Sequence, residues 1–197
     1  MWTVANLITI SRILLIAPFL YFVQQERLGE ALAVFVVAGI SDGLDGWVAR
    51  RYGQYSTLGR FLDPLADKLL TTASFVFLAL PHRDFSSIPV WLAISVVARD
   101  VIILLGSLAV YLVMKFTQFK PTFLGKVNTI LEIGLVIAFL TFHAAGVLIG
   151  ILPALYVVVG GSVLVSGIGY LLEGVRIARV HRKAKKVSVP LAPDNVR

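Results

Sequence analysis

Residues 41–68 read SDGLDGWVARRYGQYSTLGRFLDPLADK and carry four of the 11 acidic residues of the chain, all of them aspartates. If the first half is helical, one face presents five residues at the spacing i, i+3, i+4, i+7 and i+8: Asp42, Asp45, Gly46, Ala49 and Arg50. In the second half, three residues recur at every fourth position: Gly59, Asp63 and Asp67. The short basic connection between the halves predicts that the two helices are antiparallel neighbours. We therefore expect the four carboxylates to converge near one end of a helix pair.

The composition of the whole chain indicates that lipid is its solvent. Hydrophobic residues make up 58% of the 197 residues and charged residues 15%, whereas a soluble domain has roughly 45–50% and 25%. A soluble fold could not bury this much apolar surface. The chain contains no cysteine, which excludes disulfides and thiolate metal sites.

Six apolar stretches approach or exceed the roughly 20 residues that cross a bilayer. They are residues 7–23, 28–48, 58–80, 88–114, 124–146 and 148–172. Strands are disfavoured, because lipid-exposed backbone must satisfy its own hydrogen bonds and these stretches are too long for barrel strands. We predict an all-α integral membrane protein of six transmembrane helices with a cytoplasm-facing polar cleft. We expect one domain over residues 1–186 and a loose C-terminal tail over residues 187–197.

Basic residues gather on one side of this predicted arrangement. That side holds Arg50, Arg51 and Arg60, then Lys115, Lys120 and Lys126, and the tail from Arg176 to Lys186. The other side holds Arg27 and Arg83, so the positive-inside rule predicts that both termini are cytoplasmic. The net charge of +7 then reflects membrane-flanking anchors rather than a nucleic-acid surface. No basic leader with a cleavage site is recognised, which favours a bacterial plasma (inner) membrane.

The four aspartates predict a site for divalent cations. A single aspartate at mid-membrane costs about 2.5–3.5 kcal/mol on insertion scales, and crowded carboxylates repel one another. A hard cation removes both problems, and ligands that are all oxygen suit Mg²⁺ or Mn²⁺. An isolated Asp-x-x-Asp is more often a helix cap or a solvated face. Here small residues accompany the carboxylates, and Arg50 can pair with a phosphate, which favours a functional site.

The spacing Asp-x2-Asp-Gly-x2-Ala-Arg-x8-Gly-x3-Asp-x3-Asp resembles the signature of the CDP-alcohol phosphatidyltransferase family, and every signature position is met. The resemblance implies a CDP-linked lipid donor, CMP as leaving group, two divalent cations (Mg²⁺ or Mn²⁺) and a homodimer. It implies that the metal ligands are Asp42, Asp45, Asp63 and Asp67, with Asp67 also the catalytic base. The residues implied to bind the donor are Asp45, Gly46, Ala49, Arg50 and Gly59.

The N-terminal segment adds three further candidates for donor binding. Asn6, Thr9 and Arg12 follow the spacing i, i+3 and i+6. They resemble the opening of the cardiolipin synthase and phosphatidylglycerophosphate synthase branches, in which such residues lie near the donor site. An interfacial anchor would explain the same residues.

Two segments further along the chain predict a site for the acceptor. Arg99 and Asp100 form a charge pair inside the fourth apolar stretch, where charges indicate a functional site by default; a pair that only joins helices is the alternative. Residues 120–129 read KPTFLGKVNT and open the fifth stretch. Lys126, which could equally be a snorkelling boundary lysine, and Asn128 complete a predicted pocket for the phosphate of the acceptor.

These two segments favour one acceptor. They are similar to those of the CMP-forming cardiolipin synthases. Phosphatidylglycerophosphate synthases typically carry a second arginine eight residues after the first and a second lysine, and here those positions are Ser107 and Asn128. Fewer cations suit phosphatidylglycerol, a phosphodiester, better than glycerol 3-phosphate, a dianionic monoester. The resemblance therefore implies that CDP-diacylglycerol and phosphatidylglycerol give cardiolipin and CMP, with glycerol 3-phosphate as the alternative acceptor.

Two other classes of protein are disfavoured. A membrane prenyltransferase also binds diphosphate through aspartates and metal, but its two motifs lie far apart, whereas Asp42 and Asp67 are 25 positions apart. A cation transporter would spread acidic residues over several spans and show an internal repeat. Two charges stay without a role. Glu132 either pairs with a nearby cation, which is favoured, or lines the cleft, and Lys68 either steers anionic lipid or snorkels.

Overall fold

The computed structural model describes residues 4–52, 59–114 and 123–187, and within them the side chains of residues 14–41, 68–106 and 123–174. These ranges contain six α-helices, one short 3₁₀ helix and no strand. The α-helices are α1 (Val4–Gln24), α2 (Leu28–Tyr52), α3 (Gly59–Leu78), α4 (Val90–Met114), α5 (Phe123–Ala145) and α6 (Leu152–Val187), and the 3₁₀ helix η1 is Ile149–Ile151. The prediction of an all-helical chain is confirmed for these ranges.

The helix boundaries follow the apolar stretches of the sequence, with one difference at the end. The last stretch was expected to end at residue 172, but α6 continues to Val187 and takes up the basic segment 176–186. Within the described residues, two helical segments are long and apolar enough to cross a membrane: Phe123–Ala145 and Ile149–Gly174. Other described apolar segments, such as Leu28–Ser41, are shorter. The predicted tail, residues 188–197, lies outside the described residues.

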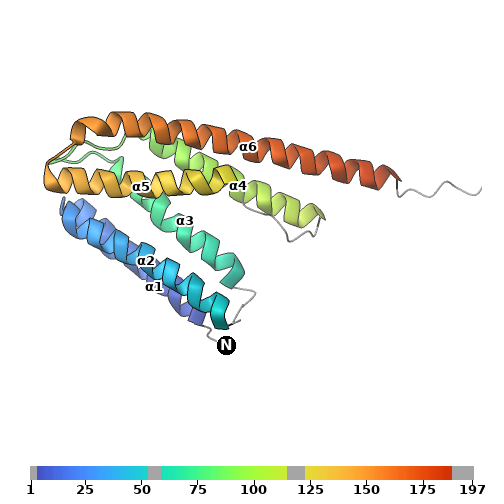
Figure 1. Cartoon of the computed structure of the whole chain (residues 1–197), viewed down its shortest axis with the longest axis horizontal. Coiled ribbons are helices and arrows are strands. Elements are labelled where there is room, and N and C mark those ends of the chain that lie inside the picture. Colours follow the sequence, from blue (N-terminus) through green and yellow to red (C-terminus); the bar gives the residue numbers. More distant parts are fainter. Residues whose placement is uncertain (1–3, 53–58, 115–122, 188–197) are drawn as a thin grey trace, which may run out of the picture.

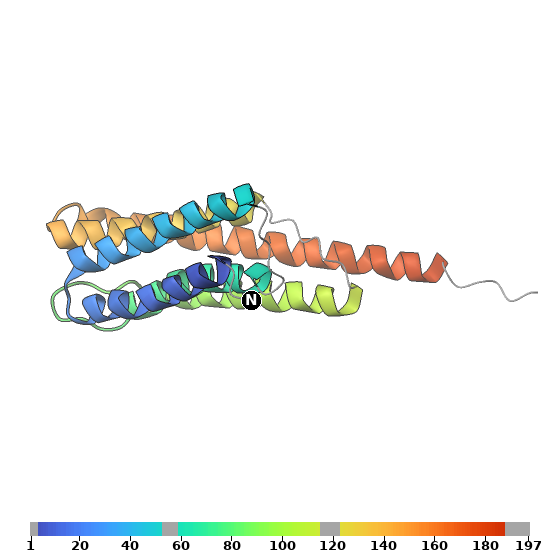
Figure 2. The same ribbon diagram turned by 90° about the horizontal axis from the view of Figure 1, so that it is seen from below.

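The six α-helices form a closed ring of neighbours. Contacts join α1 to α2, α2 to α5, α5 to α6, α6 to α4, α4 to α3, and α3 back to α1, and α3 also touches α5 across the ring. Successive helices run in opposite directions, so the connections 25–27, 79–89 and 146–151 lie at one end of the bundle, which we call the loop end (Figure 1). The ends of α2 and α4 and the starts of α3 and α5 lie toward the other end, beyond which α6 extends (Figure 2).

The helices α1 and α5 end with the same type of turn at the loop end. After α5, Gly146 has a φ of 67°, and the N–H of Val147 donates to the carbonyl of Phe142 at 3.0 Å. This is a Schellman motif, in which glycine adopts a left-handed conformation without steric cost. After α1, Glu26 takes the same position with a φ of 59°. A residue with a side chain is strained there by roughly 1–2 kcal/mol, so other contacts must hold Glu26 in place.

Apolar packing holds the ring together. Phe19, Phe75 and Phe139 lie on three different helices and are fully buried. Between α4 and α6 the packing is close: a Cβ atom on Gly160 would lie 2.6 Å from Cζ3 of Trp91. Small residues of this kind let membrane helices approach each other. The outer faces carry large exposed apolar side chains, among them Ile94 and Leu172, which is unusual for a soluble monomer.

Candidate active site

The signature residues lie on the two helices that the sequence predicts. Asp42 and Asp45 lie on α2, and Asp63 and Asp67 lie on α3. The spacing of three residues on α2 and four on α3 therefore places each pair on one helix face. The donor set contains only carboxylate oxygens, which fits Mg²⁺ or Mn²⁺.

Several predicted side chains lie outside the described ones. They are those of the four aspartates, of the predicted donor-binding residues Gly46, Ala49, Arg50 and Gly59, and of Asn6, Thr9 and Arg12 on α1. Their backbones are helical, but their convergence on a metal stays a prediction. Among the side chains that are described, no group of three or more His, Cys, Asp or Glu could hold a metal.

A buried ionic cluster begins at the residue next to Asp67. Lys68 follows it in α3, and consecutive Cα atoms lie about 3.8 Å apart. The Lys68 Nζ donates to Oδ1 of Asp100 at 2.5 Å, and Nη1 of Arg99 donates to the same oxygen at 2.7 Å. The Arg99 and Asp100 side chains are only 5% and 9% exposed. One carboxylate oxygen therefore offsets two cations and joins α3 to α4.

Arg99 also ties this cluster to α6. Its Nη2 donates to Oγ of Ser166 at 2.9 Å. The guanidinium carbon lies 5.7 Å from the centre of the Tyr170 ring, which is within the range of a cation–π contact. The guanidinium is thereby fixed between two helices, which is the kind of rigid placement that phosphate recognition requires.

A second series of hydrogen bonds, between α5 and α6, lies beside the ionic cluster. Nδ2 of Asn128 donates to Oε1 of Glu132 at 2.6 Å, and Oγ of Ser162 donates to Oδ1 of Asn128 at 2.8 Å. Asn128 and Glu132 are 0% and 1% exposed. Ser162 lies four residues before Ser166, and a spacing of four places the two serines on one face of α6. The ionic cluster and this second series of hydrogen bonds therefore meet along that face of α6.

The cluster has polar atoms without partners. Among the described residues, nothing forms a hydrogen bond with Nε of Arg99, Oδ2 of Asp100 or Oε2 of Glu132, although all three atoms are buried. The charged groups that act electrostatically on Glu132 are Asp100, Lys68 and Arg99. The cluster thus contains two formal cations and two carboxyl groups. Buried polar atoms without a partner are costly.

Two of the three predicted acceptor residues lie in this cluster, and the third lies near the start of α5. Arg99 and Asn128 lie within it, and the predicted Arg99–Asp100 pair is present. Lys126 is exposed near the start of α5, six residues or about 9 Å along the helix from Glu132. Glu132 was expected to pair with a cation or to line the cleft, and its Oε1 accepts a hydrogen bond from the amide of Asn128.

Sequence reasoning missed the bond from Lys68 to Asp100 and the two serines. The serine spacing within an apolar helix was a usable signal. The bond from Lys68 was not, because it joins residues 32 positions apart.

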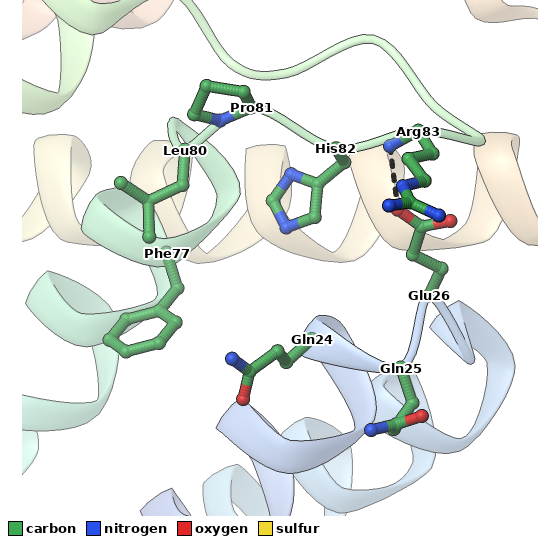
Figure 3. A pocket seen from close by; sticks show the side chains of 8 residues that line it. All are labelled: Gln24, Gln25, Glu26, Phe77, Leu80, Pro81, His82 and Arg83. Carbon is green, nitrogen blue, oxygen red and sulfur yellow. Dashed lines mark hydrogen bonds between the residues drawn. The ribbon is translucent and has the colours of Figure 1, made fainter.

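A pocket of about 420 Å³ opens at the other end of the bundle (Figure 3). Its lining residues come from the ends of α1 and α3 and the connections that follow them: Gln24, Gln25, Glu26, Phe77, Leu80, Pro81, His82 and Arg83. The backbone N–H of Arg83 donates to Oε1 of Glu26 at 2.7 Å. This bond joins the α1–α2 turn to the α3–α4 connection and holds the strained Glu26 in place. The signature residues lie toward the opposite ends of α2 and α3, so this pocket is separate from them.

Two carboxylates at this end influence each other. The hydrogen bond from the Arg83 backbone lowers the pKa of Glu26 below its ordinary value. The hydrogen bond that Asp84 shares with Glu26, together with the negative charge of Glu26, raises the pKa of Asp84. Asp84 is exposed and Glu26 is half-buried, and both lie in connections between helices. Asp84 is therefore the carboxyl of the pair that holds a proton at the higher pH.

Comparison with known proteins identifies the family. The profile described as CDP-alcohol phosphatidyltransferase matches residues 2–165. The chain belongs to this family, and the prediction that it is an enzyme of this kind is confirmed. With the two long apolar helices, family membership indicates a membrane protein.

Among its relatives are the CMP-forming cardiolipin synthases of Rattus norvegicus and Homo sapiens. Each is 37% identical over 153 residues, which is 70% of this chain and 49% or 50% of the relative. The chain therefore spans about half the length of these relatives. A CDP-diacylglycerol–glycerol-3-phosphate 3-phosphatidyltransferase of Aquifex aeolicus is 29% identical over 181 residues, 88% of this chain and 97% of that protein. Both acceptor classes considered from the sequence thus occur among the relatives.

Proposed function

We propose that the chain is a CMP-forming cardiolipin synthase, which transfers the phosphatidyl group of CDP-diacylglycerol to phosphatidylglycerol. The names of the rat and human relatives support this acceptor. The observation that carries the proposal is the charge balance of the buried cluster. Lys68 and Arg99 share one oxygen of Asp100, and Glu132 lies within their electrostatic reach. Since Asp100 offsets one of the two cations, at most one positive charge remains, and the cluster suits a phosphodiester with one charge better than a monoester with two.

The family signature provides the donor site in this proposal. Asp42, Asp45, Asp63 and Asp67 would hold two divalent cations, Mg²⁺ or Mn²⁺. When bound, such ions offset the charge of the diphosphate and of the departing CMP. Seven residues of α1, α2 and α3 would bind the nucleotide and diphosphate beside Asp45: Asn6, Thr9, Arg12, Gly46, Ala49, Arg50 and Gly59.

The reaction then proceeds by displacement at the phosphorus of the donor. The acceptor hydroxyl oxygen forms a bond to that phosphorus, and the bond from phosphorus to the CMP oxygen breaks. Asp67 takes the proton of the hydroxyl, as a general base. The Lys68–Asp100 bond supports this role, because it joins the residue after the base to the helix that carries Arg99. The positions of Asp67 and Arg99 relative to each other are thereby fixed.

The topology belongs to the same proposal. We assign six transmembrane helices, a cleft that faces the cytoplasm, two cytoplasmic termini, a bacterial plasma membrane and a homodimer. The alternation of helix directions supports this arrangement, because Arg27 and Arg83 lie at the loop end of the bundle. The more numerous basic residues at the end of α2, the start of α5 and the end of α6 lie toward the other end. Lys and Arg favour the cytoplasmic side.

The second candidate is a phosphatidylglycerophosphate synthase, which uses glycerol 3-phosphate. The Aquifex aeolicus relative favours it, since the match covers 97% of that protein. The reaction at phosphorus and the role of Asp67 would be unchanged. Only the acceptor differs.

Product analysis distinguishes the two candidates. Purified protein in detergent receives CDP-diacylglycerol, Mg²⁺ or Mn²⁺, and one of the two acceptors. We expect cardiolipin and CMP from phosphatidylglycerol alone, and no CMP after chelation of the metal. The Asp67→Asn variant serves as the chemical control, with turnover expected to fall by a factor of about 10² or more. Phosphatidylglycerophosphate from glycerol 3-phosphate would establish the second candidate, and full activity of the Asn variant would remove Asp67 as the base.

A further inference from the structure

The unpartnered atoms of the buried cluster indicate what kind of group completes it. Nε of Arg99 is a donor that needs an acceptor, and Oε2 of Glu132 and Oδ2 of Asp100 are acceptors that need donors. A ligand that fits all three must present anionic oxygen and hydroxyl groups together. A phosphate linked to a polyol has both.

A metal ion fits these two carboxyl oxygens less well. Lys68 and Arg99 lie in the same cluster, and both already bind Asp100. A divalent cation would be repelled by two cations in a medium of low dielectric constant. A hydroxyl donor brings no net charge, so it can bind a buried carboxyl oxygen without that penalty.

We propose that Glu132 binds the hydroxyl group of the acceptor that does not react, and so makes the enzyme selective for a glycerol head group. This inference rests on the proposed function. A glycerol phosphate or glycerol phosphodiester has one primary hydroxyl that attacks and a neighbouring secondary hydroxyl that stays intact. The secondary hydroxyl donates to Oε2 of Glu132, while the phosphate of the acceptor accepts from Arg99.

The surroundings of Glu132 suit a recognition role. Its Oε1 is fixed by Nδ2 of Asn128, and the amide oxygen of Asn128 is fixed in turn by Ser162. The carboxyl group therefore has one oxygen anchored and one available, on a side chain that is 1% exposed. An anchored, desolvated acceptor discriminates strongly, because a substrate without the hydroxyl leaves it unpaired.

The test compares acceptors that differ by this one hydroxyl. Phosphatidylglycerol is compared with phosphatidyl-1,3-propanediol, and glycerol 3-phosphate with 3-hydroxypropyl phosphate. We expect the unmodified protein to favour the glycerol member of the pair it uses by about tenfold or more in kcat/KM, which corresponds to one hydrogen bond to a charged group. In Glu132→Met this preference should fall close to one.

Ser162→Ala is the matched control. It removes the bond to Asn128 two steps away from the acceptor, so it should lower kcat/KM for both members of a pair by the same factor. If Glu132→Met does not fold, Glu132→Gln keeps an oxygen for Asn128, and its preference should fall at least threefold.

Each outcome has a distinct meaning. Equal use of both members of a pair by the unmodified protein, or an unchanged preference in a folded Glu132 variant, overturns the role of Glu132 and leaves the proposed function standing. A preference found only in the pair with glycerol 3-phosphate keeps the role of Glu132 but replaces the proposed acceptor. No CMP from either glycerol acceptor overturns both.

Discussion

Asp100 accepts from Lys68 and from Arg99 on one oxygen, so its single negative charge determines how much positive charge the cluster offers a ligand. Its side chain is 9% exposed, and water therefore screens these charges little. The type of phosphate that the cluster accepts depends on this residue as much as on the arginine.

Asp100→Asn should move the acceptor preference toward glycerol 3-phosphate. The variant leaves the cluster one charge more positive, which favours a dianion, and the ratio of kcat/KM for glycerol 3-phosphate over phosphatidylglycerol should rise about tenfold. Steady-state CMP release with each acceptor measures this ratio. Asp100→Glu, which keeps the charge, should leave the ratio within a factor of about three. A ratio that Asp100→Asn does not change would show that charge balance does not select the acceptor.

The residues of the site differ in how far the sequence could predict them. Arg99 and Asn128 were identifiable because polar groups within apolar stretches are costly and indicate a site. The bonds between helices were not, since Lys68 to Asp100 and Asn128 to Ser162 join residues of different helices. Such bonds depend on which helices are neighbours and how far each is rotated. A residue's own sequence surroundings do not contain that information.

At the scale of the helix, boundaries were predictable and neighbours were not. The predicted stretch 28–48 became α2, Leu28–Tyr52, because the length of an apolar run approximates the length of the helix. The ring order α1, α2, α5, α6, α4, α3 could not be read in the same way, and it places α1 and α5 beside α2, where the sequence predicted α3. In lipid both faces of a helix can be apolar, so the pattern does not reveal which face packs against protein.

Gly160 tests the close approach of α4 and α6. The Gly160→Ala variant places a Cβ atom 2.6 Å from the Trp91 ring, which must move. Overpacking costs about 1–3 kcal/mol, and the helix preference of alanine offsets part of this, so the midpoint of thermal unfolding in detergent should fall relative to that of Gly161→Ala. Gly161→Ala is the matched control, because a Cβ atom there meets nothing within 4 Å. Its midpoint should stay unchanged or rise slightly, since alanine favours helices. Equal midpoints for the two variants would contradict the packing between α4 and α6.

The connection between α3 and α4 should make stability depend on pH. The pKa of Asp84 is raised in the folded protein. The contribution of Asp84 to stability is therefore present at low pH and is lost as the pH rises through this raised pKa. Asp84→Asn removes the repulsion from Glu26, and should therefore raise the unfolding midpoint at neutral pH but not near pH 3.8, the ordinary value for aspartate. Unfolding midpoints of both proteins, measured from pH 3.8 to neutral pH, test whether the gain appears only at the higher pH.

Glu26→Gln is the companion variant. The pKa of Glu26 is lowered, so its contribution is present above its ordinary value of 4.5 and is lost as the pH falls through the lowered value. The variant weakens the bond to the Arg83 backbone, and should lower the midpoint at neutral pH. A gain from Asp84→Asn that is largest in acid would reverse the assignment of the two carboxyl groups.

At the scale of the molecule, the two ends of the bundle have different chemistry. The loop end contains the pocket beside Glu26 and the arginines 27 and 83. The signature residues on α2 and α3 lie toward the other end, beyond which α6 extends (Figure 1). If the chain crosses the membrane as proposed, the catalytic end and the basic end of α6 face the same compartment. Donor and acceptor would then be drawn from the leaflet on that side.

Single cysteines can test this orientation, because the chain contains none and labelling has no background. Ser86→Cys places a thiol in the α3–α4 connection at the loop end, and Ala184→Cys places one near the end of α6. In spheroplasts, a maleimide that does not cross membranes should label the Ser86 variant directly and the Ala184 variant only after permeabilisation. Retained CMP release in both variants shows that the fold is intact. The reverse labelling pattern would place the catalytic end outside the cytoplasm, where a nucleotide-activated lipid donor is not supplied, and would contradict the positive-inside assignment.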